Sequence, residues 1–167
     1  MGIKTRITTT LAACTLLLGV STAHAAEFDT TMETILAEYI EIQQALAADS
    51  TEGVQRATQA IRDSATKLQP GQAAGEHAEH YKSIPQDLLA ACEKLAAAQD
   101  IGSLREAFKE LSKPVSMWVT MAEPEHTSVM YCSMAKAGWV QRGSKVANPY
   151  FGSEMLTCGE KVGGSEH

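Results

Sequence analysis

The sequence contains no apolar stretch of the roughly 20 residues that a helix needs to cross a membrane. One shorter apolar run extends from Leu11 to Val20. It follows Lys4 and Arg6 and precedes Ala23-His24-Ala25, an order typical of a secretory signal peptide with a small-residue cleavage site. We therefore predict a signal peptide over residues 1–25, export to the periplasm and no stable membrane insertion.

Cys14 offers an alternative to simple cleavage. Leu11-Ala12-Ala13-Cys14 has the form of a lipidation box, and an acylated Cys14 would anchor the protein to a membrane. However, the apolar run continues through Leu18, whereas lipoprotein signals place this run before the cysteine. The sequence thus favours a periplasmic protein without a lipid anchor.

The familiar catalytic motifs are also missing. There is no GxSxG elbow, no HExxH, no glycine-rich phosphate loop and no pair of carboxylates marked by its context. Neither Cys132 nor Cys158 belongs to a CxxC motif, and no histidine is tied to either by sequence. We predict that the protein is not an enzyme.

Positive charge is scarce. The chain has 14 Lys and Arg against 20 Asp and Glu, a formal net charge of −6. Removal of a signal peptide carrying Lys4 and Arg6 would leave the mature chain more acidic still. Such a domain is poorly matched to nucleic acid or to an anionic membrane surface. A metal cation is the more natural partner, and we expect no nucleic acid.

Strand signals are equally weak, because no alternating run is long enough to indicate a strand. Apolar residues instead recur at helical spacing in four segments, at about 30–48, 54–68, 85–98 and from Ser103 to about Met121. Thr30 with Glu33, and Ser103 with Glu106, form candidate capping boxes. Pro114 lies within the last segment, where it removes a backbone donor and should kink the helix.

These segments predict an all-α fold, an antiparallel four-helix bundle with an irregular, turn-rich C-terminal cap. The bundle is expected over residues 26–122 and the cap over residues 123–160. A flexible tail should follow at 161–167.

The chain has four cysteines, of which Cys92, Cys132 and Cys158 would remain after export. Cys92 falls on the apolar stripe of its helix, so we expect it to be buried like a small hydrophobic residue. Cys132 and Cys158 are then the pair available for chemistry.

Methionine accompanies both of these cysteines. Cys132 lies two residues before Met134, and Met155 lies three residues before Cys158. Thiolate and thioether sulfur are soft donors that favour Cu(I) over harder ions. We predict a metal site formed by Cys132, Met134, Met155 and Cys158, with copper as Cu(I) and His126 as a further candidate ligand.

A disulfide between Cys132 and Cys158 is the alternative. It would stabilise the fold by about 3.5 kcal/mol on the chain-entropy account of loop closure. The methionines would then be ordinary core filler.

The same C-terminal region carries motifs in a fixed order: Tyr131-Cys132-Ser133-Met134-Ala135, Trp139, Asn148-Pro149-Tyr150-Phe151-Gly152 and Met155-Leu156-Thr157-Cys158-Gly159. This pattern resembles a bacterial family of small exported helical domains of unknown function, with the pattern YCPMA, W, NPYYG and MLxCG. The family occurs alone and also appended to periplasmic adaptor subunits of copper and heavy-metal efflux pumps. Ser133 replaces its proline. The resemblance implies a helical periplasmic domain linked to metal handling.

Three hypotheses follow. The first is a periplasmic soft-metal binding protein involved in metal handling or resistance. The second is a helical interaction module for a metal-efflux adaptor or an oxidase, with a structural Cys132–Cys158 disulfide. The third is a thiol redox sensor.

Overall fold

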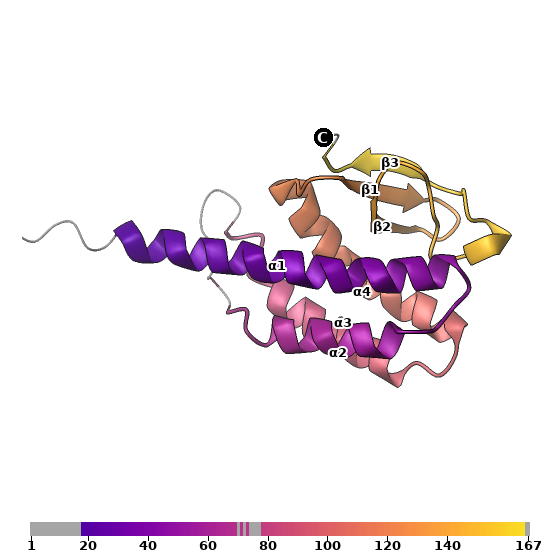
Figure 1. Cartoon of the computed structure of the whole chain (residues 1–167), viewed down its shortest axis with the longest axis horizontal. Coiled ribbons are helices and arrows are strands. Elements are labelled where there is room, and N and C mark those ends of the chain that lie inside the picture. The colour runs from indigo at the N-terminus through magenta and orange to yellow at the C-terminus, as the bar shows by residue number, and fades with distance from the viewer. Residues whose placement is uncertain (1–17, 70, 72, 74–77, 166–167) are drawn as a thin grey trace, which may run out of the picture.

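The computed structural model describes residues 18–69, 71, 73 and 78–165. These residues form four helices, three strands and one 3-10 turn, arranged as in Figure 1. The helices are α1 (Leu18–Ala47), α2 (Val54–Ala65), α3 (Ile84–Ala97) and α4 (Ile101–Ala122). The strands are β1 (Thr127–Cys132), β2 (Ala137–Arg142) and β3 (Glu160–Gly163), and the turn is η1 (Gly152–Glu154).

The predicted all-α class is wrong, because the C-terminal segment forms an antiparallel sheet. Its strands lie in the order β2-β1-β3, with β1 in the centre. The hairpin of β1 and β2 pairs Thr127 with Arg142 at one end and Cys132 with Ala137 at the other. The domain is therefore α+β, and the expected flexible tail at 161–167 begins inside β3.

The sheet was missed for a physical reason. β1 is buried at every position except Tyr131, so the alternation of apolar and polar residues that marks a half-exposed strand is absent. Its sequence, TSVMYC, is nevertheless rich in β-branched and aromatic residues, which suit strands. A fully buried strand of this length gives no clear periodic signal.

The four predicted helices are present, with different starts for two of them. α1 already includes Leu18, the first described residue, and runs through Thr30, whose hydroxyl donates to the Ala26 carbonyl within the helix instead of capping it. α4 is capped by Asp100 together with Ser103, one turn earlier than the predicted Ser103–Glu106 box. Pro114 lies inside α4.

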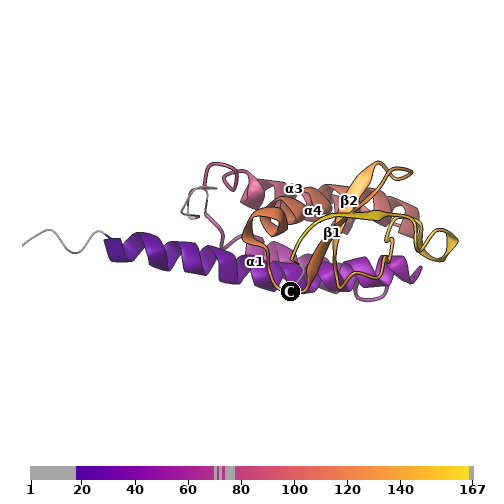
Figure 2. The same cartoon turned by 90° about the horizontal axis from the view of Figure 1, so that it is seen from above.

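The elements form layers, with α1 and α4 between the sheet and the pair α2 and α3. α4 contacts both β1 and β2, and α1 contacts β2, while α2 and α3 pack on the helical side. Figures 1 and 2 show the sheet lying along one side of α1 and α4. No helix within the described ranges is long and apolar enough to cross a membrane.

Three buried hydroxyl groups join these layers. The Tyr39 hydroxyl of α1 lies 2.8 Å from Ser112 Oγ of α4 and accepts a 3.0 Å hydrogen bond from the Val140 N–H of β2. The Tyr150 hydroxyl donates to the Gly138 carbonyl of β2 and also contacts Ser112 Oγ. Burial raises the pKa of both phenols, so both remain neutral hydrogen-bonding groups.

We expect Tyr39→Phe to lower the free energy of unfolding by about 1–3 kcal/mol, because the Val140 N–H would lose its partner while buried. Urea unfolding followed by circular dichroism measures this loss. Thr34→Ala removes an exposed hydroxyl of the same helix and should change stability by no more than about 0.5 kcal/mol. Equal effects of the two substitutions would contradict a structural role for the buried network.

Candidate functional site: a pair of thiols at the edge of the sheet

Cys132 and Cys158 lie together at one end of the sheet. Cys132 is the last residue of β1, and Cys158 lies two residues before β3. Because Tyr131 pairs with Glu160 in the antiparallel ladder, the chain brings the two cysteines onto neighbouring strands. Their Sγ atoms are 3.2 Å apart, and both are free thiols. The structure thus brings together the two cysteines that the sequence singled out.

Asn148 fixes the position of Cys158. Its side-chain N–H donates a 2.6 Å hydrogen bond to the Cys158 carbonyl, and its backbone N–H donates to the Leu156 carbonyl at 2.8 Å. Its side-chain oxygen accepts from the Tyr150 N–H at 2.8 Å, which closes an Asx turn. Asn148 is completely buried, so this short segment is held rigidly against the sheet.

Gly159 allows the segment that contains Cys158 to pack closely against the core. It has φ +151°, and a Cβ at this position would lie 2.5 Å from the Trp139 ring. Trp139 is fully buried. Cys158 therefore reaches Cys132 because a residue without a side chain follows it.

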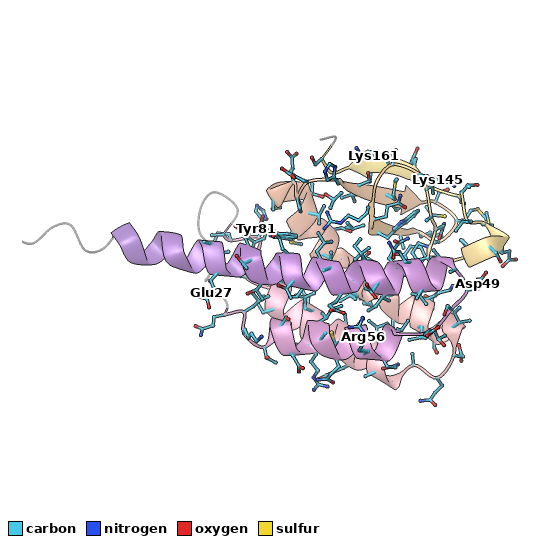
Figure 3. The ribbon with its side chains drawn as sticks, in the orientation of Figure 1. Glu27, Asp49, Arg56, Tyr81, Lys145 and Lys161 are labelled. Atoms are coloured by element: carbon cyan, nitrogen blue, oxygen red, sulfur yellow. The ribbon has the colours of Figure 1, made fainter. Side chains whose placement is uncertain are left out.

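A second attachment ties the same segment to the helices. Arg105 of α4 donates to the carbonyls of Pro149 and Leu46 at 3.0 and 2.9 Å and forms a 2.6 Å ion pair with Asp49. Asp49 also accepts a 2.9 Å hydrogen bond from the Ser153 N–H. Figure 3 shows Asp49 at the end of α1, beside the turn that contains residues 152–154.

The two thiols have different proton affinities. Burial raises the pKa of Cys132, but the N–H groups of Ala135 and Met134, the Cys158 thiol and the Asn148 side chain all favour its thiolate. Together they bring the pKa of Cys132 below its ordinary value. The hydrogen bond to Cys132, aided by burial, raises the pKa of Cys158. Cys132 is therefore the more acidic thiol of the pair and the first to lose its proton as the pH rises.

Met155 and Met134 differ in how far their side chains are buried near the two cysteines. Met155 is half-buried, and its carbonyl accepts a 3.0 Å hydrogen bond from the Cys158 N–H, so the two residues share one turn. Met134 lies in the hairpin turn after Cys132, and its side chain is 65% exposed. Both stay close to a cysteine along the chain, but Met155 has the more enclosed position.

His126 is not placed with the thiols. It is exposed and precedes β1, whereas Cys132 ends that strand. The six intervening steps of an extended strand correspond to about 20 Å. This separation excludes His126 as a fellow ligand of Cys132 in this conformation.

Across the part of the chain that the structure describes, no group of three or more His, Cys, Asp or Glu side chains could hold a metal ion. Cys92 is fully buried in the helical core, as predicted, and burial raises the pKa of its thiol to about 11. Among the described residues, any further donor to an ion at Cys132 and Cys158 would therefore be a group other than a His, Cys, Asp or Glu side chain, and the Met134 and Met155 thioethers are the candidates that the sequence singled out.

Sequence reasoning did not assign roles to Asn148 and Arg105, although both position the site. Asn148 precedes a proline, which is a turn signal, but its hydrogen bond to a carbonyl ten residues later is not visible in the sequence. Arg105 reaches Pro149 across 44 residues, and no local pattern marks such a contact.

Fold and site together define an α+β domain with two neighbouring cysteines at one end of its sheet. The chain belongs to the family described as Protein of unknown function (DUF3347), which it matches over residues 35–127, more than half of its length. The matched range ends before Cys132, so the dithiol lies outside it. No curated protein and no solved structure matches the chain.

Stability should fall in acid through Asp49. Hydrogen bonds from Ser153 and the contact with Arg105 lower the pKa of Asp49 from 3.8 to about 2. A carboxylate with a depressed folded-state pKa stabilises the fold above its unfolded value and loses this effect as the pH falls through the folded value. The loss is therefore expected between about pH 4 and pH 2.

Asp49→Asn tests this expectation, because Asn also tolerates the left-handed φ of +56° at this position. The unfolding free energy of the variant should be lower than that of the natural protein at pH 5 and should converge with it near pH 2. Glu52→Gln in the adjacent exposed loop serves as the control. A difference that stays constant over this range would exclude the ionised Asp49 as its cause.

Proposed function

We propose that this protein binds one soft metal ion, Cu(I), through the thiolates of Cys132 and Cys158 and takes part in periplasmic metal handling or resistance. The 3.2 Å approach of two free thiols carries this proposal. Both thiols would lose their protons when the ion binds, since metal ligands must be deprotonated.

The donor chemistry supports a soft ion. Structural zinc sites use four protein ligands, most often several Cys and His. The described residues provide no third His, Cys, Asp or Glu beside this pair. Thioether sulfur is the remaining protein donor close by in the chain, and thiolate with thioether favours Cu(I). Of the two methionines we favour Met155, because its side chain is half-buried in the turn that carries Cys158.

The environment supports binding of a cation at this point. Backbone N–H groups and the Asn148 side chain already stabilise negative charge on Cys132, so one ligand is prepared before the ion arrives. Cys158 is only partly buried, which leaves the sulfur pair accessible from one side. The ligands sit on a sheet that is attached to the helices, so few side-chain rotations are needed.

A chelator competition tests the proposal. The full chain, reduced and kept without oxygen, should hold about one Cu(I) against bathocuproine disulfonate. Cys132→Ser and Cys158→Ser should each weaken binding at least about 100-fold, since loss of a supporting outer group alone can cost roughly 10–100-fold. Cys92→Ser is the matched control and should bind as the natural protein does.

Methionine variants refine this test. Met155→Leu should weaken Cu(I) binding more than Met134→Leu, and neither should unfold the protein, because Leu conserves volume. The proposal would be overturned if the natural protein released all Cu(I) to the chelator, or if the Cys132 and Cys158 variants bound it unchanged.

The same distance favours a second function, reversible disulfide formation. The Sγ atoms need to approach by about 1.2 Å to reach the roughly 2.05 Å of a disulfide. Cys132 is the thiolate that would attack an incoming disulfide or oxidant, and Cys158 would resolve the mixed species.

Mass spectrometry of the intact native protein distinguishes the two functions. A redox pair should lose two hydrogens per chain on mild oxidation and regain them with thioredoxin-like reductants, with no bound metal. A metal site should carry the mass of copper while both thiols stay reduced. A chain that neither binds copper nor loses hydrogens would exclude both functions.

A further inference from the structure

A groove lies between α4 and the β1–β2 hairpin, apart from the sulfur pair. Its volume is about 570 Å³. Met117 and Met121, one helical turn apart on α4, form its apolar wall with Tyr131 of β1. The size falls within the 300–1,000 Å³ typical of small-molecule sites, which are mostly apolar with a few polar groups.

The charged side chains around the groove are mainly cationic. Lys109 and Lys113 of α4 and Lys136 of the hairpin turn line it, and Glu110 is the one acidic residue among its lining residues. The Glu110 carboxylate already accepts two hydrogen bonds from Lys113, at 2.8 and 2.9 Å. Lys136 is exposed and forms no ion pair with a described residue. Three lysines around one groove contrast with the net charge of −6 of the whole chain.

Lys109 also contacts two residues that do not line the groove. It forms a 2.7 Å ion pair with Glu106 and lies 5.8 Å from the centre of the Tyr150 ring. The carboxylates of Glu106 and Glu110 offset the charges of Lys109 and Lys113, so Lys136 is the lysine at the groove whose charge no described residue pairs. The groove therefore favours an anionic occupant over a neutral or cationic one.

A hydroxyl inside the groove also lacks a partner. Ser116 lines the wall, and its Oγ is buried without a hydrogen bond to any described residue. Buried polar groups are normally satisfied, by protein, water or ligand.

We propose that this groove binds a small amphipathic organic anion, an apolar body of roughly medium-chain fatty-acid size carrying one carboxylate. Met117, Met121 and Tyr131 contact the apolar body. Lys113 and Lys136 attract the carboxylate at the rim. The volume of the groove suits a ligand of this size, and the lysines favour a negative charge on it.

Fluorescence titration of the full chain with anilinonaphthalene sulfonate, an apolar dye with one negative charge, tests the site. Binding should saturate at one dye per folded chain and weaken as salt rises. Octanoate should displace the dye, whereas octylammonium, with the same apolar tail and the opposite charge, should not. Displacement by both to the same extent would overturn the charge selectivity.

Variants locate the site. Lys113→Gln and Lys136→Gln should each weaken octanoate binding about three- to tenfold, and Lys67→Gln, which removes an exposed charge after α2, should leave it unchanged. Thr120→Trp fills the groove from an exposed position and should abolish binding while the circular dichroism spectrum stays native. Unchanged binding in Thr120→Trp would place the dye elsewhere and refute the proposal, whatever the outcome of the copper experiment.

Discussion

The attachment of the sheet to the helices rests on hydroxyl groups that the core completely surrounds. Tyr39, Ser112 and Tyr150 come from α1, α4 and the turn before η1, and together they satisfy the backbone of β2 at Val140 and Gly138. Buried backbone groups require hydrogen-bond partners. β2 must therefore pack in the register and orientation that bring its backbone groups to these hydroxyls. Every other feature of the C-terminal region depends on the sheet having this position.

The sulfur pair is one consequence. Cys132 is placed by β1, which pairs with the anchored β2, while Cys158 is placed by Asn148 and by the close packing of Gly159 on Trp139. Arg105 then connects the Asn148 segment to the C-terminal end of α1. The two thiols thus meet because strand pairing positions Cys132 while hydrogen bonds and close packing position Cys158. Such preorganisation lowers the entropic cost of gathering ligands around an ion or of closing a disulfide.

The hairpin also relates the two proposed sites. Cys132 ends β1 beside Tyr131, which lines the groove, and Lys136 closes the same turn. The sulfur pair has soft donors, whereas the groove has lysines and an apolar wall. The two sites therefore suit different ligands, although a conformational change of the β1–β2 hairpin would alter both sites.

The sequence alone determined the four helical segments and the burial of Cys92, because helical periodicity is a local property, and it singled out Cys132 and Cys158 as the pair available for chemistry. It did not reveal the sheet, since β1 is buried almost throughout and lacks alternation. Nor did it place His126 apart from the thiols. The meeting of Cys132 with Cys158 and the roles of Asn148 and Arg105 were decided only by the tertiary structure, because they arise from contacts between residues far apart in the chain.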